Sequence, residues 1–174
     1  MKKFKTYLAG AFCPYKFEKK EYPDWRDFVI EKLNNKRIQL YDPRFKSDQL
    51  CPATFTIDDA KGVLNSNILL HFRTRGYEDE GASWEHGIAF GVNLYNQKLK
   101  KLPNFLIDKS LIFPSKLVIY ADETNVPFPL HFASANLTFN SLETSVKFLN
   151  SLKSLRKRDF MPFYMKLMDK ERAG

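Results

Sequence analysis

The sequence has few cysteines and lacks any long apolar run. Its two cysteines, Cys13 and Cys51, do not have the spacing of a metal-binding pair. This usage is typical of reduced thiols in a cytoplasmic protein. No apolar stretch approaches the roughly 20 residues of a transmembrane helix. The N-terminus MKKFKTYLAGAF begins with a basic segment, but its apolar part is too short for a signal peptide. We therefore expect a cytoplasmic protein without a membrane partner.

Histidine is scarce as well, and the sequence contains no repeat or low-complexity segment. The three histidines, His71, His86 and His131, are scattered along the chain and do not form a metal-ligand pattern. We therefore expect neither a metal nor a cofactor. The 174 residues suit one domain with a sizeable core, and the apolar fraction of 44% is ordinary for a globular protein.

Basic residues outnumber acidic ones, with 28 Lys and Arg against 20 Asp and Glu. The net charge of +8 permits a nucleic-acid or phosphate partner but does not require one. Much of the excess lies near the C-terminus, so we distinguish a basic extension over residues 154–174 from the main part of the domain, 1–153. A solvated basic surface is the simpler interpretation, and we expect no nucleic-acid polymer as partner.

Short apolar runs alternate along the chain with segments of helical spacing. Because apolar residues three and four apart share one face of a helix, the spaced segments predict helices, whereas the short runs predict strands. The predicted strands are KTYLAGAF (5–12), RIQLYDP (37–43), NILLHF (67–72), KLVIYAD (116–122) and NLTF (136–139). The predicted helices are YPDWRDFVIEKLNN (22–35), TIDDAKGVLNS (56–66), a helix opened by EDEGASWEHGIAFG (78–91) and SLETSVKFLNSLKSL (141–155).

This alternation predicts a single α/β domain of the Rossmann or flavodoxin type, with a mainly parallel central sheet of about five strands flanked by helices. Thr56 and Ser141 are the expected caps of the second and fourth helices. Gly87 and Gly91 are expected to let the third helix approach the sheet closely. The segments 42–54 and 98–116 are expected to be irregular. Such sheets bind ligands beyond the carboxyl ends of their strands.

Glu85 stands out because it shares a helix face with apolar residues. Ile88, Ala89 and Val92 follow it at three, four and seven positions, so this carboxylate lies on the face that a helix normally buries. The helix N-terminus favours the ionised form of Glu85, and burial opposes it. A shielded carboxylate suits a nucleophile or an electrostatic stabiliser. The alternative is that Glu85 pairs with Arg73 or Arg75 and caps its own helix.

Further acids fall near the same helix start. Asp79 precedes the helix, and Asp58 and Asp59 lie on the preceding one. Several carboxylates around one cleft suit the cleavage of a glycosidic bond, in which one attacks the sugar carbon and another protonates the leaving group.

Three motifs in order resemble the nucleoside 2-deoxyribosyltransferase family over roughly residues 4–140: TYLAGAF, YDPR and DEGASWEHGIAFG. The family is similar in having YLAGP at the first strand and D-x-G-x-x-x-E-x-G-x-A at the third helix. The resemblance implies transfer of 2-deoxyribose between nucleobases by double displacement. It also implies deoxynucleosides and nucleobases as partners, and a homo-oligomer with shared active sites.

The resemblance also implies the roles of individual residues. Glu85 would be the nucleophile, Asp79 would help to hold the sugar, and Tyr7 would orient Glu85. Asp59 would bind and protonate the base, with Asp58 as the alternative. Substrate-binding roles are expected for Gly10, Phe12, Asp58, Gly81 and Arg73.

The sequence departs from the family pattern at several positions. Ala11 stands where the family usually has proline, and the strand end at 71–73 is bulkier and more basic than usual. Phe128 falls near the place of a polar residue that the family supplies from a neighbouring subunit. Four nearby residues are alternatives for that polar group: Asn125, His131, Ser134 and Asn136.

Two other functions remain open at this point. One is a hydrolase that acts on a 2′-deoxynucleoside 5′-monophosphate, with Arg73 or Arg75 holding the phosphate. The other is a non-catalytic nucleotide-binding module. The aromatic residues Phe12, Tyr15 and Phe17 form either a wall for a base or a packed loop, and Trp84 is expected to anchor the core.

Overall fold

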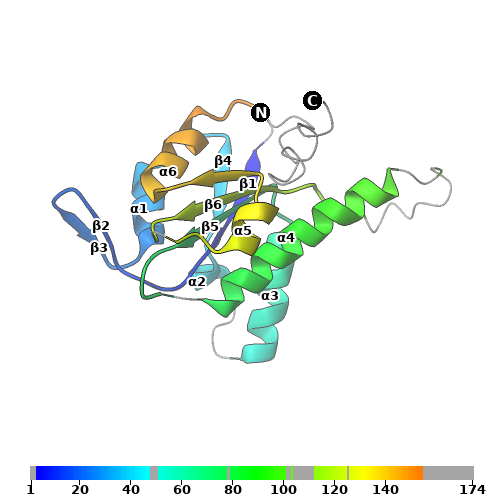
Figure 1. The fold of residues 1–174 in the computed structure, drawn as a ribbon, viewed down its shortest axis with the longest axis horizontal. Helices are drawn as coiled ribbons and strands as arrows, with labels where there is room; N and C mark the ends of the chain where they lie inside the picture. Colours follow the sequence, from blue (N-terminus) through cyan, green and yellow to red (C-terminus); the bar gives the residue numbers. More distant parts are fainter. Residues whose placement is uncertain are drawn as a thin grey trace.

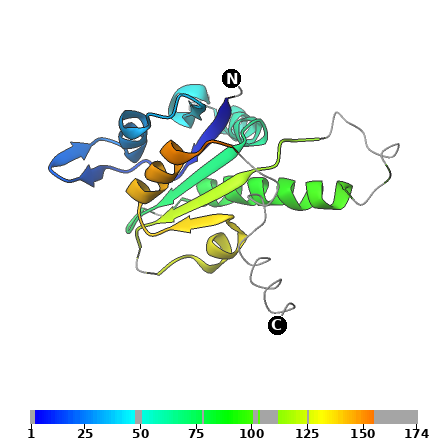
Figure 2. The same ribbon diagram turned by 90° about the horizontal axis from the view of Figure 1, so that it is seen from above.

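The central sheet has five parallel strands in the order β4-β1-β5-β6-β7. A computed structural model describes residues 3–47, 51–77, 79–100, 103, 112–124 and 126–154. The strands are β1 (Phe4–Ala9), β4 (Ile38–Tyr41), β5 (Ile68–Arg73), β6 (Leu117–Asp122) and β7 (Leu137–Phe139). Figure 2 shows them side by side and pointing the same way. The predicted single α/β domain with a parallel sheet of about five strands is therefore confirmed.

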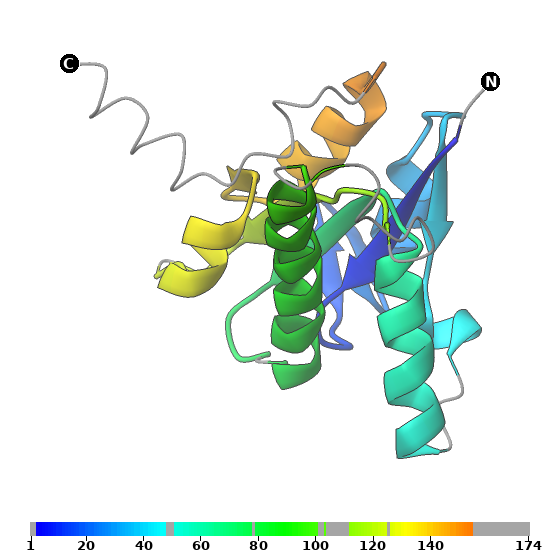
Figure 3. The same ribbon diagram turned by 90° about the vertical axis from the view of Figure 1, so that its right-hand side faces the viewer.

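Helices cover both faces of this sheet (Figure 1). One face carries α1 (Trp25–Lys32) and α6 (Leu142–Ser151), which pack on Leu8, Leu70 and Ile119. The other face carries α3 (Pro52–Leu64), α4 (Glu80–Leu99) and the short α5 (Pro129–Ser134). Figure 3 shows α3 and α4 running side by side. Because successive strand residues point to opposite faces, neighbours such as Tyr7 and Leu8 lie in different cores.

Side-chain caps fix the start of four described helices, among them α2 (Pro43–Lys46), where the Asp42 carboxylate accepts from the backbone N–H of Arg44. Asp24 and Asp27 form a capping box at the start of α1, where the Asp24 carboxylate accepts from the backbone N–H of Arg26. The hydroxyl of Ser141 accepts from Thr144 at the start of α6, which confirms the predicted cap. Asp79 caps α4, since its carboxylate accepts from the backbone N–H of Gly81 at 2.8 Å.

The structure corrects the predicted start of the second helix. Thr56 lies inside α3, which begins at Pro52 after the N-cap residue Cys51, and the Thr56 hydroxyl donates to the Pro52 carbonyl. Proline at the first helical position explains the earlier start, because its missing N–H is not needed there. The segment 42–54 is not wholly irregular either, since α2 spans Pro43–Lys46.

The sequence patterns missed two further elements, a β-hairpin and α5. The hairpin pairs β2 (Tyr15–Phe17) with β3 (Lys20–Tyr22) in antiparallel fashion, and Figure 1 shows it projecting beside the main sheet. The predicted irregular segment 98–116 falls largely outside the described residues, as does all of the basic extension after residue 154. Among the helices that the structure describes, none has both the length and the apolar character to cross a membrane.

Candidate active site

The predicted site residues gather where the strand order reverses. From β1 the chain proceeds to β4 on one side and then to β5 on the other. The helices that follow the two neighbouring strands therefore diverge, and a crevice opens beyond the carboxyl ends of β1 and β5. Tyr7 lies near this end of β1, opposite Leu69 of β5 and Tyr41 of β4. The second turn of α4, which carries Glu85, packs on the same face of the sheet.

Tyr7 and Glu85 form a buried hydrogen-bonded pair. The Tyr7 hydroxyl donates to Glu85 Oε1 at 2.5 Å, and both residues are buried. Burial and the neighbouring Glu85 raise the pKa of Tyr7 far above its usual range, so its hydroxyl stays protonated and remains a donor. The alternative that Glu85 pairs with Arg73 is wrong, because Arg73 binds Asp122 at 3.3 Å and Thr124 at 3.0 Å.

The ring of Tyr7 is held in place by packing. Tyr41 stacks on it with ring centroids 5.2 Å apart and an interplanar angle of 19°. On α3, Gly62 leaves room for both rings. A Cβ there would lie 2.7 Å from the Tyr7 ring and 2.8 Å from the Tyr41 ring. The absence of a side chain at Gly62 therefore lets α3 press against Tyr7 and fix the ring that carries the donor.

Two further carboxylates act on Glu85. Burial is the largest influence on Glu85 and raises its pKa to about 8. The charges of Asp59 and Asp79 also raise this pKa, whereas the hydrogen bond from Tyr7 favours the ionised form and lowers it. Burial therefore outweighs the Tyr7 hydrogen bond and the charge of Arg26 in setting the pKa of Glu85. Like charges in one site disfavour full ionisation, so Glu85 and Asp59 hold their protons more readily than isolated carboxyl groups.

Asp59 belongs to this group of acids, and the charge of its neighbour Asp58 raises the pKa of Asp59. Asp59 is buried and accepts a short hydrogen bond from the Ser47 hydroxyl. Burial raises its pKa, although the bonds from Ser47 and Tyr7 favour its ionised form. Asp58 is half-buried and lies 3.8 Å from the ammonium group of Lys61. A raised pKa suits a carboxyl group that is required to hold a proton.

Arg26 is a site residue that the sequence patterns missed. Its guanidinium is fully buried, pairs with Asp24 at 3.1 Å and donates to the carbonyls of Leu8, Gly10 and Ala11. It thereby fixes the loop after β1, and its charge lowers the pKa of both Glu85 and Asp59. A buried arginine is stable only when its donors are satisfied, and the accepting carbonyls are invisible in a sequence pattern.

Gly10 meets a backbone requirement in that loop. Its φ is +150°, and a Cβ there would lie 2.6 Å from the Phe72 carbonyl oxygen. A side chain is therefore excluded where β1 turns towards the crevice. Phe12, two residues on, is 57% exposed and lies under the Arg26 guanidinium. Tyr15 and Phe17 instead pack on Phe28, as the packed-loop alternative expected.

A pocket of about 200 Å³ opens beside the acids. Its walls include Ala11 from the loop after β1, His71 and Arg73 from β5, Asp79 before α4, and Phe128 and His131 near α5. Tyr7, Asp59 and Glu85 are not among its lining residues, whereas Asp79, whose charge acts on Glu85, is one of them. Its volume is below the roughly 300–1,000 Å³ of small-molecule sites, so it suits one part of a ligand.

The three histidines, which are far apart in the sequence, lie close together in the fold. His71 Nδ1 lies 3.0 Å from His86 Nδ1, and the His131 ring lies 4.7 Å from that of His71 and 4.8 Å from that of His86. Burial lowers the pKa of His86 to about 3 and that of His131 to about 4. Within the described part of the chain, no group of three or more His, Cys, Asp or Glu residues is arranged to hold a metal ion.

Two other expectations about α4 are corrected. Trp84 does not anchor the core, since it is 46% exposed. Gly87 and Gly91 do not provide the close approach of α4, because a Cβ at either position would meet nothing within 4 Å. The helical spacing in the sequence did not distinguish Trp84, Gly87 and Gly91, which are exposed, from Glu85, which is buried.

The candidates for the neighbouring-subunit group have contacts within their own chain. His131 lies in the histidine cluster, Ser134 contacts His86 Nε2 at 2.8 Å, and Asn136 Oδ1 accepts from the backbone N–H of Val118 at 2.6 Å. Asn125 lies outside the described residues. Phe128 contacts the His131 ring, with centroids 4.7 Å apart.

Chemically, the site combines a buried carboxylate, a neutral phenol donor and a second carboxyl group with a raised pKa. A carboxylate next to a fixed donor can attack an electrophilic carbon. A protonated carboxyl group can donate its proton to a leaving group as that group departs. A pair of carboxyl groups in these roles is the arrangement used to cleave glycosidic bonds.

Comparison with solved structures identifies proteins of the same fold. A 2-deoxyribosyltransferase from the psychrotolerant bacterium Bacillus psychrosaccharolyticus, characterised as a biocatalyst for nucleoside synthesis, superposes with a TM-score of 0.51 at 15% sequence identity. The alignment covers 86% of this chain and 92% of that one. At this identity the likeness establishes a shared fold.

A conserved protein from Enterococcus faecalis V583 is also similar, with 19% identity and a TM-score of 0.42, over 98% of this chain and 99% of that one. No protein-family model and no curated protein sequence matches this chain.

Proposed function

We propose that this chain is a nucleoside 2-deoxyribosyltransferase, which moves 2-deoxyribose from one nucleobase to another by double displacement. The observation that carries this proposal is the buried Tyr7–Glu85 hydrogen bond with Asp59 and Asp79 close enough to raise the pKa of Glu85. The fold shared with the Bacillus 2-deoxyribosyltransferase agrees with it. The order of motifs in the sequence, which resembles that family, supports the same reaction.

In the first half-reaction, ionised Glu85 attacks C1′ of the deoxyribose. A glycosyl ester forms as the bond between C1′ and the base nitrogen breaks, and the electron pair of that bond leaves with the base. Asp59, with its raised pKa, donates the proton that the departing base takes up. The neutral Tyr7 hydroxyl orients the attacking oxygen, and Asp79 holds the sugar.

The second half-reaction reverses these steps with another base. Its ring nitrogen attacks C1′, its N–H proton passes to Asp59, and the ester bond to Glu85 breaks. Glu85 returns as a carboxylate and Asp59 is protonated again, so the chain itself supplies every proton acceptor and donor. The proposal therefore needs no cofactor and no metal, and its ligands are deoxynucleosides and free nucleobases.

We further propose a homo-oligomer that shares its active sites between subunits. The support is the exposed apolar surface around α5, formed by Val126, Phe128, Leu130 and Phe132, next to the pocket that Phe128 and His131 line. Among the described residues, neither Cys13 nor Cys51 is part of a disulfide, which agrees with the reducing cytoplasm that we propose as the location.

Transfer can be tested directly. The protein is incubated with a 2′-deoxynucleoside and a different free base, and both nucleosides are followed by chromatography. We expect a new deoxynucleoside that contains the added base. We also expect folded Glu85→Gln to be at least roughly a thousandfold slower, on the scale of losing covalent catalysis.

Four results would contradict all or part of this proposal. Free base and deoxyribose without a new nucleoside would indicate a hydrolase. Preference for the 5′-monophosphate, lost in Arg73→Ala, would favour the nucleotide hydrolase. No cleavage of any deoxynucleoside would leave a binding module. Near-normal activity of folded Glu85→Gln would remove Glu85 from the mechanism.

A further inference from the structure

The outward side of α4 is apolar, although the helix already buries its inward side against the sheet. Between the charged residues Glu80 and Lys98, its exposed positions are Gly81, Trp84, Gly87, Gly91 and Tyr95. Trp84 is 46% exposed and Tyr95 is 39% exposed. Surface helices of globular proteins normally carry charged and polar residues on the side away from the core. An uncharged outer side of this length suits contact with another molecule.

These positions line up along the helix. With about 3.6 residues per turn, the central ones lie within about 20° of one direction: Glu80, Gly87, Gly91 and Lys98. Trp84, Leu94 and Tyr95 lie within about 60° of it, and we call all these residues together the α4 face. From Glu80 to Lys98 the face is about 27 Å long. That length is comparable to the width of a standard interface of roughly 800 Å² per partner.

Two hollows border the α4 face at Gly91. One, of about 470 Å³, is lined by Gly91, Leu94, Tyr95, Gln97 and Lys98. The other, of about 350 Å³, is lined by Leu64, Gly91, Val92, Tyr95 and Phe113. A Cβ at Gly91 would meet nothing within 4 Å, so the absence of a side chain leaves this space open. Four residues spaced as 91, 94, 95 and 98 form the hole that accepts a side chain from a facing helix.

The face matches itself when it is turned end to end about Ala89. Gly87 lies two positions before Ala89, and Gly91 lies two positions after it. Trp84 lies five positions before Ala89, and Tyr95, which lines both hollows, lies six positions after it. Two antiparallel copies of α4 related by a two-fold axis at this level would therefore place glycine against glycine and each Trp84 in a hollow of the other copy.

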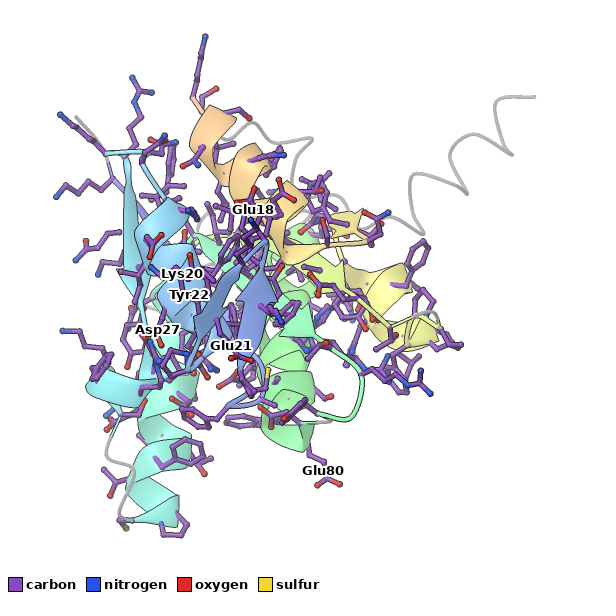
Figure 4. The ribbon with its side chains drawn as sticks, turned by 90° about the vertical axis from the view of Figure 1, so that its left-hand side faces the viewer. Glu18, Lys20, Glu21, Tyr22, Asp27 and Glu80 are labelled. Atoms are coloured by element: carbon purple, nitrogen blue, oxygen red, sulfur yellow. The ribbon has the colours of Figure 1, made fainter. Side chains whose placement is uncertain are left out.

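The charges at the two ends of the face follow the same symmetry. Glu80 lies nine positions before Ala89, and Lys98 lies nine positions after it. Figure 4 shows the Glu80 side chain projecting outward from the N-terminal end of α4. Within the part of the chain that the structure describes, neither Glu80 nor Lys98 forms an ion pair. An antiparallel pair brings each Glu80 to Lys98 of the other copy, whereas a parallel pair would bring like charges together.

We propose that two copies of this chain pack against each other through the α4 face, antiparallel and about a two-fold axis at the level of Ala89. The hollow at Gly91 receives Trp84 of the second copy, and the pairs between Glu80 and Lys98 fix the orientation. This interface is additional to the one proposed around α5, with which it shares no residue. It does not depend on the proposed reaction, so the two proposals can fail separately.

Light scattering over a range of protein concentrations tests the interface. We expect Trp84→Glu to weaken the association of the two copies at least about a hundredfold, because each two-fold interface loses two buried tryptophans. The molar mass at micromolar concentration should fall accordingly. Phe45→Glu is the matched control, since Phe45 is also an exposed aromatic residue but lies on α2, outside the α4 face. It should leave the molar mass unchanged.

Charge reversal tests the antiparallel orientation. Glu80→Lys or Lys98→Glu alone should weaken the association roughly fivefold, since exposed ion pairs are individually weak and this pair occurs twice in the interface. The two substitutions together should restore the association to within about twofold of the wild type. This comparison decides the matter if Trp84→Glu does not fold.

Disulfide cross-linking tests the register. In a Cys51→Ser background, which removes the exposed native thiol, Gly87→Cys and Gly91→Cys are prepared as two separate proteins. Oxidation of their mixture should give disulfide-linked dimers, because positions 87 and 91 face each other across the axis. Either protein alone should give few, because two thiols at the same position are offset along the helices beyond the reach of a disulfide.

An unchanged molar mass in folded Trp84→Glu would overturn the proposal, as would a wild type that is monomeric at micromolar concentration. The antiparallel arrangement would be overturned if the double charge reversal did not recover, or if Gly87→Cys alone cross-linked as well as the mixture. The transfer assay judges the proposed function separately. A monomer that transfers deoxyribose would refute this interface, and an α4-paired dimer without transfer would refute only the reaction.

Discussion

At the scale of single residues, the site depends on the balance of forces at Glu85. The Tyr7 hydroxyl and the charge of Arg26 favour the carboxylate, whereas burial and the neighbouring acids favour the protonated form. Burial is the largest effect, and it raises the pKa of Glu85 to about 8. The proposed nucleophile is therefore mostly protonated at neutral pH when no ligand is bound.

This pKa predicts a pH dependence whose sign is fixed by the reacting form. Only ionised Glu85 attacks C1′, so kcat/KM should rise with pH and level off above about 8. At pH 6 it should lie about a hundredfold below the plateau, as expected two units below a single pKa. The profile is measured with a deoxynucleoside whose base is positively charged. Such a base leaves without taking up a proton, so the rate does not depend on proton donation by Asp59 and reports the ionisation of Glu85 alone.

Tyr7→Phe provides the control for that profile. It removes the hydrogen bond that favours the ionised form, so the rising limb should move to higher pH. A flat profile between pH 5 and 9, or an unchanged limb in Glu85→Gln, would show that another group governs the rate.

At the scale of secondary-structure elements, glycines on two helices have opposite roles. Gly62 on α3 is buried against Tyr7 and Tyr41, whereas Gly87 on α4 is exposed with open space around its Cα. From the sequence we expected Gly87 and Gly91 to allow the close packing, because they lie in the motif and Gly62 does not. Which face of a helix meets the sheet depends on tertiary packing, and a glycine carries no hydrophobic signal of its own.

The two positions make a matched pair for substitution. Gly87→Ala should raise the free energy of unfolding by about 0.5–1 kcal/mol, since alanine favours the helix and meets no neighbour. Gly62→Ala should lower it by about 1–3 kcal/mol through overpacking and reduce transfer activity by displacing Tyr7. Denaturant unfolding of both variants checks this, and a similar effect of the two substitutions would contradict the assigned role of Gly62.

At the scale of the whole molecule, local patterns predicted the sheet and the grouping of the main acids. Alternating runs indicated all five parallel strands, and Ser141 was recognised as a cap from its position. The resemblance brought Tyr7, Asp59 and Glu85 to one place, and the structure has them close together. Such features are encoded within a few residues or a short motif.

Long-range features were beyond these patterns. The three histidine rings come together only in the folded chain. His71 lies on β5, and the helices α4 and α5, which carry His86 and His131, pack on one face of the sheet. Arg26 lies in a helical pattern that gives no hint of its burial, because the carbonyls that satisfy it belong to the loop after β1. The β2–β3 hairpin has strands of only three residues, too short for an alternating pattern to be recognised.

The exposed surface of α5 bears on how the whole molecule assembles. Leu130 is 70% exposed and Val126 76% exposed, while Phe128 reaches both this surface and the pocket. Contiguous apolar surface on a soluble protein commonly marks an interaction site. A second copy of the chain placed against α5 would cover this surface beside the pocket that Phe128 and His131 line, as required for active sites shared between subunits.

We therefore predict at least a dimer at micromolar concentration, measured by light scattering, with α5 in the interface. Leu130→Glu places a charge in that interface, so it should lower the molar mass and reduce transfer activity by at least about tenfold. Ile30→Glu is the control, because Ile30 is also exposed but lies on α1, on the opposite face of the sheet; it should change neither quantity. A fully active wild-type monomer would refute the shared site. If Leu130→Glu dissociated but remained fully active, assembly through α5 would stand, and each pocket would be complete within one chain.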